Sequence, residues 1–420
     1  MAVVGAGPAG LFATIEIGRR QPDLTVCLVD QGPGLVARRD GQAGAATPWS
    51  GFGGAGFFIG GRLALNPDSL SSAPVNIDRT DAVGIRRYVE SLLLDWNAGG
   101  AVLERAPLAL AEASIQAERF GLTWHLNYPA RHLSAEERLR ALDRISNELQ
   151  HSGVQVIPET TVSRMEPYPG GWLLVLEPEG QLEAESVILA PGRSGASWLA
   201  RTLESAGASI QARTSVGVRI ETLSSVCVPL TDLTPDPRLS METPTGRFRT
   251  YACAKGSYVQ VVDLDGAARI SLRPGGDRPS PNTSFSLLWE PPTPEAIPVG
   301  VGPSASRLAV ASEHFRERVS AHPPEPTLHL GISESRPKWP DEFWLGLADF
   351  LLRLEGLAPG IGNGDNLMYS PAVERYWEFA VAADGGIDLP GVHLAGDGAG
   401  LSQGAMAAAV SGVVAGRAVG

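Results

Sequence analysis

The sequence has little cysteine, and its few cysteines are not spaced as a redox or metal site. Cys27, Cys227 and Cys253 form no C-x-x-C pair. An odd, unpaired count is typical of a reducing compartment and argues against a dithiol redox centre or a zinc site. The seven histidines show no H-E-x-x-H spacing either. We therefore expect a cytoplasmic protein without a bound metal.

Positive charge and long apolar runs are also scarce. The chain has 34 Lys and Arg against 46 Asp and Glu, a formal net charge of -12 at pH 7. This balance disfavours nucleic acid and anionic membranes as partners. No run of about eighteen apolar residues occurs, so we expect no membrane span. The opening MAVVGAGPAG has no basic region, so we expect no signal peptide.

What is present starts with a glycine motif at the beginning of the chain. Gly5, Gly7 and Gly10 form G-x-G-x-x-G between an apolar strand and a predicted helix, LFATIEIGRR. Such glycines permit a tight turn, let a pyrophosphate approach the backbone and let the helix sit on the sheet. The helix N-terminus offers unpaired N–H groups to phosphates. The motif with this context predicts dinucleotide binding, and Pro8 and Ala9 belong to it.

An acidic residue supports this interpretation. A second apolar strand, LTVCLVD, ends in Asp30, 20 residues after Gly10. A carboxylate there can accept the hydroxyl hydrogens of an adenosine ribose. Because this needs a free 2′-hydroxyl, FAD or NAD is favoured over NADP. Gln31 and Arg39 follow the acid and complete this part of the candidate site.

The C-terminal segment favours FAD over NAD. It reads GVHLAGDGAGLSQGAMAAAVSGVVAGRAV, a short strand, then Asp397, then a helix of small residues. An acid preceded by Gly396 suits a ribityl chain and pyrophosphate. The helix start at Gly404 and Ala405 can face the flavin pyrimidine and stabilise negative charge there. A plain NAD dehydrogenase needs no such element.

The middle of the chain adds a predicted hairpin turning at Gly170 and Gly171, followed by a strand that ends in VILAPG. In this order the pieces resemble the glutathione-reductase-like class of FAD proteins. The resemblance implies that the strand around Val162 offers backbone to adenine and that the turn at Ala190 and Gly192 lies near the flavin. No second G-x-G-x-x-G follows a strand, so we expect no dedicated NAD(P)H domain.

A glycine-rich stretch, GFGGAGFFIGGRL, carries a closer resemblance. With APGRSGASWL, VGVRIE, TYACAKGSYVQ, NTSFSLLW, SPAVERY and AGDGAG in the same order, the chain resembles uncharacterised FAD-dependent dehydrogenases related to the HI0933-like and geranylgeranyl-reductase-like flavoproteins. The family pattern differs from this chain in three places. The family has several cysteines before this stretch, whereas this chain has none there. The family has S-D-G-K where residues 59–62 of this chain read IGGR, and G-E-G-A-G where this chain has G-D-G-A-G. A cysteine-dependent function is therefore not expected to carry over.

The resemblance places the glycine-rich stretch near the flavin ring. Gly53, Gly54 and Ala55 would bring backbone N–H groups close to it, where larger side chains would block the substrate. It also draws attention to Tyr258, as a proton donor to substrate, and to Arg375, as a binder of a substrate carboxylate.

Together these patterns predict an α/β fold: a glutathione-reductase-like, FAD-binding Rossmann-like domain with an inserted β-rich α+β substrate domain. We expect a discontinuous FAD-binding domain of residues 1–65, 150–204 and 386–420. A helical segment would span 66–149, and a substrate or cap domain 205–385.

The predicted function is an FAD-dependent oxidoreductase that transfers hydride between noncovalent FAD and a small organic substrate. Transiently docked NAD(P)H, or another electron donor or acceptor, is a second candidate partner. Two alternatives stay open from the sequence: a flavin monooxygenase of specialised metabolism, and a non-redox cyclase or binding protein that uses FAD as a scaffold.

Overall fold

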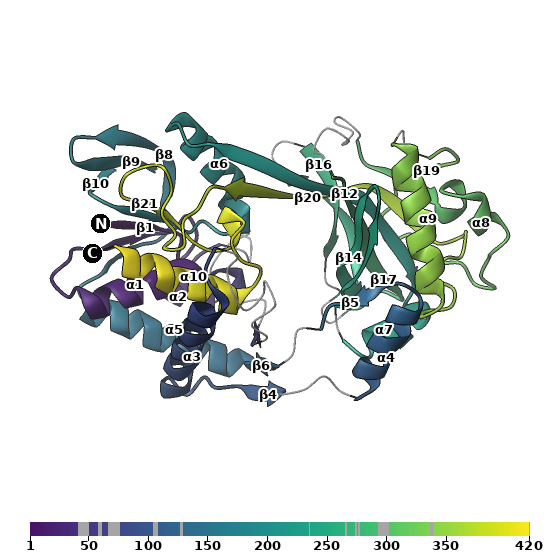
Figure 1. Ribbon diagram of the computed structural model, residues 1–420, viewed down its shortest axis with the longest axis horizontal. Helices are drawn as coiled ribbons and strands as arrows, with labels where there is room; N and C mark the ends of the chain where they lie inside the picture. Colours follow the sequence, from purple (N-terminus) through teal and green to yellow (C-terminus); the bar gives the residue numbers. More distant parts are fainter. Residues whose placement is uncertain are drawn as a thin grey trace. The chain divides into compact units, whose positions relative to one another are not determined.

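The computed structural model divides the chain into two compact units (Figure 1). Unit 1 comprises Met1–Arg105, Asn127–Ala212 and Tyr376–Gly420, and unit 2 comprises Ala106–Leu126 and Arg213–Arg375. The domain boundaries expected from the sequence stay a prediction, because compactness alone does not define an independently folding domain. The structure describes residues 1–40, 50–57, 61–65, 76–103, 108–126, 129–234, 236–264, 267–273, 275, 278–292, 302–336 and 339–419.

Unit 1 is built on a five-stranded parallel sheet in the order β21-β11-β1-β2-β7. Numbered along the chain, this is the 3-2-1-4-5 order of a doubly wound fold. Each strand pairs with its neighbour over three residues, for example Ala2–Val4 with Cys27–Val29. The strands are β1 (Ala2–Val4), β2 (Cys27–Val29), β7 (Gln155–Ile157), β11 (Val187–Leu189) and β21 (Val392–Leu394).

Both faces of this sheet are covered, which explains the continuous apolar run in β1. Val3 joins a core formed with helices, whereas Ala2 and Val4 join a second core on the other face, formed with a small antiparallel sheet. The helices and strands concerned are α1 (Pro8–Arg20), α3 (Arg79–Asp95), α5 (Ala135–His151), α6 (Ala196–Ser205), α10 (Ala405–Ala418), β8 (Thr161–Tyr168), β9 (Gly171–Glu177) and β10 (Gln181–Ala184).

Local signals in the sequence explain several boundaries of the elements in this unit. Ser134 and Glu137 form a capping box at the start of α5, and α3 begins at a cap from Asp78. The β8–β9 hairpin turns at Gly170, which has a positive φ of 85°. The remaining elements are α2 (Leu35–Arg39), β3 (Arg62–Ala64), β4 (Ala101–Leu103) and β6 (Ala130–His132).

Helices α1 and α10 lie side by side and run in the same direction (Figure 1). A Cβ added to Gly412 would come within 2.0 Å of the Ala9 carbonyl oxygen, and one added to Gly416 within 2.7 Å of the Ala13 oxygen. Since both contacts step forward together along the two helices, the helices are parallel. Their N-termini therefore lie at the same end of the pair, and the small residues of α10 make this closeness possible.

Unit 2 is built on an eight-stranded sheet in the order β19-β18-β20-β12-β17-β14-β13-β5, with a separate β15–β16 hairpin. This unit and the parallel sheet of unit 1 confirm the predicted fold class. Its elements are α4 (Leu108–Arg119), β5 (Thr123–Trp124), β12 (Ile210–Leu223), α7 (Ser224–Thr231), β13 (Leu239–Thr243), β14 (Gly246–Lys255), β15 (Tyr258–Leu264), β16 (Ala267–Arg273), β17 (Asn282–Glu290), β18 (Ser304–Arg307), α8 (Glu313–Arg316), β19 (Ile332–Ser333), α9 (Asp341–Glu355) and β20 (Leu367–Phe379).

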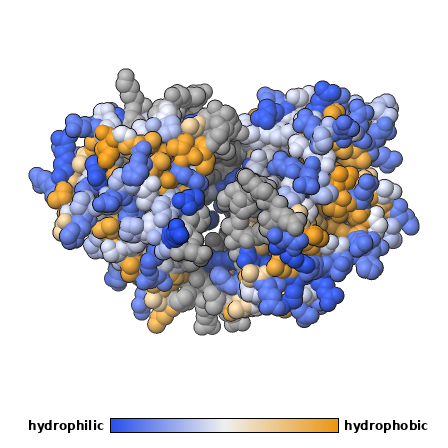
Figure 2. All heavy atoms as spheres, turned by 180° about the vertical axis from the view of Figure 1, so that it is seen from behind, coloured by the Kyte–Doolittle hydropathy of each residue, from blue (hydrophilic) through white to orange (hydrophobic). Residues whose placement is uncertain are grey.

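The face shown in Figure 2 is mainly hydrophilic, with apolar side chains gathered in a few places. Exposed apolar residues are ordinary on protein surfaces when they are scattered. Among the residues that the structure describes, no helix combines the length and apolarity needed to cross a bilayer.

Candidate functional site

The turn between β1 and α1 has one open position. A Cβ added to Gly5 would come within 2.1 Å of the Ala190 oxygen, and a Cβ added to Gly10 would come within 1.8 Å of the Gly5 oxygen. These two glycines therefore serve close packing of the backbone. Gly7 differs, because its nearest neighbour would be the Gly54 Cα at 4.0 Å, and Gly7 is only partly buried. A ligand can approach the backbone at Gly7.

Two helix N-termini open at this place without a side-chain cap. Gly7 is the N-cap of α1 and Gly404 the N-cap of α10, and neither helix receives a side-chain cap hydrogen bond. The first N–H groups of a helix need partners and carry partial positive charge. Since the helices are parallel neighbours, both positive ends face the same side of unit 1. Gly404 is exposed and Ala405 partly so.

The glycine loop, which we define as residues 51–57, lies directly on this turn. Gly53 donates a backbone hydrogen bond to the Ala6 oxygen at 2.8 Å. A Cβ on Gly56 would come within 2.6 Å of Pro8 Cγ and 2.9 Å of Ala405 Cβ, so this residue lies between the first residues of α1 and α10. At Gly56, a larger side chain would collide with both helices. We call the β1–α1 turn, the glycine loop and the start of α10 the cradle.

Asp30 ties the cradle together. Its Oδ2 accepts from the Ala6 N–H at 2.7 Å, and its Oδ1 accepts from Gly32 at 2.7 Å and Gly51 at 2.9 Å. One carboxylate thus joins the β1–α1 turn, the β2–α2 segment and the glycine loop. Sequence analysis identified Asp30 as a ribose acceptor but missed this structural role. No signal in the sequence indicates it, because Gly51 lies 21 residues downstream.

Two adjacent arginines of α2 take different directions. Arg38 Nη1 donates to the carbonyls of Gly51, Phe52 and Gly54 at 3.2, 2.9 and 3.4 Å. Burial lowers the pKa of Arg38, and the nearby Asp30 carboxylate acts in the opposite direction. Arg39, the predicted cofactor contact, is exposed and pairs with Asp143 of α5. Arg38 is therefore the arginine that contacts the glycine loop, and the role of Arg39 stays a prediction.

The turns after β11 and β21 meet beside the cradle. A Cβ on Gly398 would come within 2.3 Å of the Gly192 oxygen, and one on Gly396 within 2.9 Å of Ala9 Cβ. Arg193 Nε lies 3.3 Å from Asp397 Oδ2, and the Asp397 side chain keeps 25% of its surface exposed. The predicted acid is therefore accessible, although it is ion-paired.

The other predicted cofactor residues lie in the same unit. Gln31 is exposed next to Asp30, and Ala190 is buried at the end of β11. Val162 is buried in β8, where the pairing with β9 shifts register just after it. The structure thus gathers the predicted cofactor residues in unit 1, and their contact with a cofactor stays a prediction.

The two predicted catalytic residues belong to other segments. The Tyr258 hydroxyl, at the start of β15 in unit 2, donates to the Arg278 carbonyl at 3.0 Å. The Arg273 guanidinium lies 4.5 Å from the centre of the Tyr258 ring. Arg375 lies in β20, and its side chain is outside the described residues. Both roles stay predictions.

Unit 2 contains a buried polar network that sequence analysis missed. Arg219 of β12 is 1% exposed and donates to Ser284 Oγ at 3.0 Å, to Ser286 Oγ at 3.1 Å and to the Ala252 carbonyl at 2.9 Å. Burial lowers the pKa of Arg219 to about 10. Because its donors meet protein acceptors, this network stabilises the sheet and offers little to a ligand.

Glu221, two residues further along β12, is fully buried as well. Its carboxylate accepts from Asn282 Nδ2 at 3.0 Å, from Thr327 Oγ1 at 2.6 Å and from the Tyr369 hydroxyl at 2.8 Å. Burial and this carboxylate raise the pKa of Tyr369. These bonds connect β12 with β17 and β20 and satisfy the buried carboxylate.

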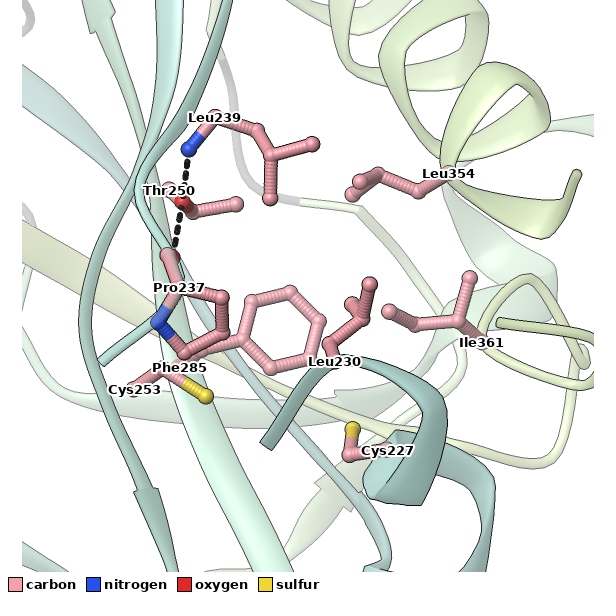
Figure 3. Close-up of a pocket in the computed structure, with 9 residues that line it drawn as sticks. All are labelled: Cys227, Leu230, Pro237, Leu239, Thr250, Cys253, Phe285, Leu354 and Ile361. Carbon is pink, nitrogen blue, oxygen red and sulfur yellow. Dashed lines mark hydrogen bonds between the residues drawn. The ribbon is translucent and has the colours of Figure 1, made fainter. Parts of the chain in front are cut away.

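The cavity drawn in Figure 3 lies in unit 2 and is small, with a volume of about 10 Å³. Its lining is apolar apart from Thr250 and the thiols of Cys227 and Cys253. At most one water molecule fits such a volume, and the apolar walls offer it few partners. In the described part of the chain, no group of three or more His, Cys, Asp or Glu side chains is placed to hold a metal.

Neither a protein-family model nor a curated protein sequence matches the chain. Among solved structures, it is similar to glycine oxidase from Geobacillus kaustophilus, with 15% identity, a TM-score of 0.41 and coverage of 100% of this chain and 93% of the other. It is also similar to a flavoprotein/dehydrogenase from Cytophaga hutchinsonii, with 14% identity, a TM-score of 0.39 and coverage of 100% and 77%. A third similar structure is CtdE in complex with FAD, with 13% identity, a TM-score of 0.36 and coverage of 99% of this chain and 82% of the other. Because these identities and TM-scores are low, the cofactor and the reaction are inferred only from the chain's own residues.

Proposed function

We propose that the chain binds FAD noncovalently and acts as an FAD-dependent oxidoreductase on a small organic substrate. The observation that carries the proposal is the cradle, where two uncapped helix N-termini and a glycine loop meet around Gly7. A dinucleotide presents a pyrophosphate that such a helix end can bind. The N–H groups at the start of α10 can donate to the acceptor atoms of a flavin ring. A turn that binds only a mononucleotide has no second helix end of this kind.

The residues of unit 1 supply a place for each part of FAD. The N–H groups of Gly7 and Ala9, at the positive end of α1, would hold the pyrophosphate. Asp30 Oδ2 accepts one hydrogen bond in the structure and has a further lone pair for a ribose hydroxyl. Asp397 would accept from the ribityl chain, and the start of α10 at Ala405 would face the pyrimidine edge of the ring.

Bound FAD supplies a ring that can accept or donate hydride. The protein's part is to orient this ring and keep its reactive edge accessible. The glycine loop suits that task, because it brings backbone N–H groups close without side chains that would cover the ring. Tyr258 remains the candidate proton donor and Arg375 the candidate carboxylate binder. NAD(P)H or another soluble electron carrier remains a candidate partner, and the HI0933-like relationship is the family we propose.

The first test is cofactor binding by the purified full chain. We expect bound flavin absorbance on purification or after incubation with FAD, and weaker binding of FMN, which lacks the adenosine that Asp30 would hold. A protein that gains no flavin absorbance from either compound would contradict the proposal.

Gly7→Ala sharpens the test. Gly7 has an ordinary φ of -77°, and an added Cβ would meet only the Gly54 Cα at 4.0 Å. The folded protein can therefore accept the methyl group, whereas a pyrophosphate at this backbone cannot. We expect weaker FAD binding, by at least about tenfold, with an unchanged melting temperature in the absence of FAD. Gly331→Ala is the matched control, because its Cβ would have open space.

The reaction type is tested on the FAD-bound protein. Anaerobic incubation with fractions of a metabolite extract, and separately with NADH and NADPH, identifies which compound reduces the flavin. Product analysis in the presence of isotopically labelled O₂ then separates a dehydrogenase from a monooxygenase. Turnover that proceeds without O₂ or any electron donor or acceptor, and without a change in the redox state of the flavin, would indicate the non-redox scaffold instead.

A further inference from the structure

Arg38 faces a row of backbone carbonyls in the glycine loop. Its Nη1 donates to Gly51, Phe52 and Gly54, three acceptors within four consecutive residues. Hydrogen bonds from a charged donor are stronger than those between neutral groups. Contacts of one guanidinium with three carbonyls therefore fix the peptide planes of this short segment, which has no regular strand partner to do so.

The orientation of these carbonyls determines where the next N–H groups point. A trans peptide is planar, so the carbonyl of one residue and the N–H of the next point in opposite directions. With the Phe52 carbonyl turned to Arg38, the Gly53 N–H reaches the Ala6 oxygen at 2.8 Å. With the Gly54 carbonyl turned to Arg38, the Ala55 N–H also points away from the arginine.

Ala55 lies in the first turn of the short helical stretch that begins at Gly54, and the N–H groups of a first helical turn have no acceptor within their own helix. Ala55 is also only partly buried, whereas Phe52, Gly53 and Gly54 are buried. Its N–H therefore lies on the open side of the loop. Such open N–H groups are satisfied by side chains, by water or by a ligand.

We propose that Arg38 is a positioning residue of the cradle. It holds the carbonyls of Gly51, Phe52 and Gly54 on its own side of the loop, and thereby presents the Ala55 N–H to an acceptor atom of the bound flavin. This inference rests on the FAD binding proposed above. Arg38 acts through the loop and needs no contact with the cofactor itself.

The test compares Arg38→Met with Arg38→Lys and with a control, Arg316→Met. Arg316 is an exposed arginine with one ion pair to Glu313 in unit 2. Hydrogen exchange of a peptide covering residues 50–57, measured without FAD, reports the loop. We expect faster exchange in Arg38→Met, an intermediate rate in Arg38→Lys, and an unchanged rate in Arg316→Met.

FAD titration of the same proteins reports the cofactor. We expect the dissociation constant of FAD to rise by at least about tenfold in Arg38→Met, with a smaller rise in Arg38→Lys. The visible spectrum of the bound flavin should shift toward that of free FAD, because one hydrogen bond to the ring is lost. A merely structural role elsewhere in the protein would not change this spectrum.

The outcomes separate the two proposals. Wild-type exchange rates over residues 50–57 in Arg38→Met would overturn the positioning role. Faster exchange with an unchanged FAD spectrum and affinity would overturn its link to the cofactor. If the wild-type protein binds no FAD, the proposed function fails, and so does this link, whereas exchange still shows whether Arg38 holds the loop. If circular dichroism shows that Arg38→Met does not fold, Arg38→Lys decides by the same two measurements.

Discussion

Asp30 illustrates how much one side chain does in this fold, because its carboxylate accepts from the N–H groups of Ala6, Gly32 and Gly51. In Asp30→Asn, one of the two oxygens becomes an NH₂ donor. At least one of these partly buried N–H groups then loses its acceptor. We expect the free energy of unfolding to fall by about 1–3 kcal/mol, measured by urea denaturation without FAD.

Asp40→Asn provides the control for Asp30→Asn, since Asp40 is exposed at the end of α2 and the same charge is removed. Equal unfolding midpoints in the two variants would show that the carboxylate of Asp30 does not hold the three turns together.

The cysteines provide a second test at the residue scale. All three are buried free thiols, and burial raises the pKa of Cys227 to about 12 and that of Cys253 well above its usual value. Because the thiolate is the reactive form, we expect no reaction of the folded protein with an aromatic disulfide reagent, and reaction of all three thiols after unfolding. Ser205→Cys, at an exposed position, should add one rapidly reacting thiol. Rapid labelling of the folded wild-type protein would contradict this prediction.

Single residues also show the limits of sequence analysis. Gly5, Gly10 and Asp30 were identified because the spacing of the motif is local. The role of Arg38 was not, since nothing in the sequence distinguishes it from Arg39. The choice between them depends on which side of the short helix α2 faces the glycine loop, and that follows from tertiary packing.

At the scale of elements, α1 and α10 pack so closely that position 412 has no room for a side chain larger than that of glycine. Gly412→Ala would place a Cβ 2.0 Å from the Ala9 carbonyl oxygen, so the helices must separate. We expect a loss of about 1–3 kcal/mol in the free energy of unfolding, together with weaker FAD binding, since the start of α10 moves.

Gly84→Ala is the matched control for Gly412→Ala. Gly84 lies in the exposed part of α3, with nothing within 4 Å of an added Cβ. Alanine favours helix more than glycine does, so this variant should be unchanged or more stable, by up to about 1 kcal/mol. Thermal unfolding of both variants measures the difference. A Gly412→Ala variant as stable as Gly84→Ala would show that the two helices are less tightly packed than in the structure.

The elements with strong local signals were predicted well. The first strand, helix and second strand and the β8–β9 hairpin all lie where the sequence placed them. The order of strands in unit 2 could not be predicted, because it depends on pairings between distant segments. The pairing of Leu239 and Ser240 in β13 with the two residues of β5 is an example, since β5 lies more than a hundred residues earlier.

At the scale of the whole molecule, stability should depend on pH through histidines whose pKa values are lowered in the folded chain. Partial desolvation lowers the pKa of His125, His132 and His393. His125 and His132 stay exposed at the surface, whereas Nδ1 of His393 is buried without a partner among the described residues. The folded pKa values lie below the unfolded value of about 6.5, so the unfolded chain takes up protons first as the pH falls. The urea midpoint should therefore fall between about pH 7.5 and about pH 5.5.

His393→Gln tests this origin of the pH dependence. Glutamine does not titrate, so the variant should lose less stability than the wild-type protein over the same pH range. Identical pH profiles would show that His393 does not contribute, and a wild-type midpoint that is independent of pH would contradict the prediction as a whole.

The packing of α10 against α1 also has a consequence for biosynthesis. The first helix leaves the ribosome almost four hundred residues before the helix that covers Ala9 and Ala13. During translation, this apolar surface has no permanent neighbour, and a nascent chain that stops before residue 405 cannot complete the place where two helix ends meet. A ligand that needs both helix ends can therefore bind only after synthesis of α10, and chains truncated before it should be recognised by chaperones and proteases.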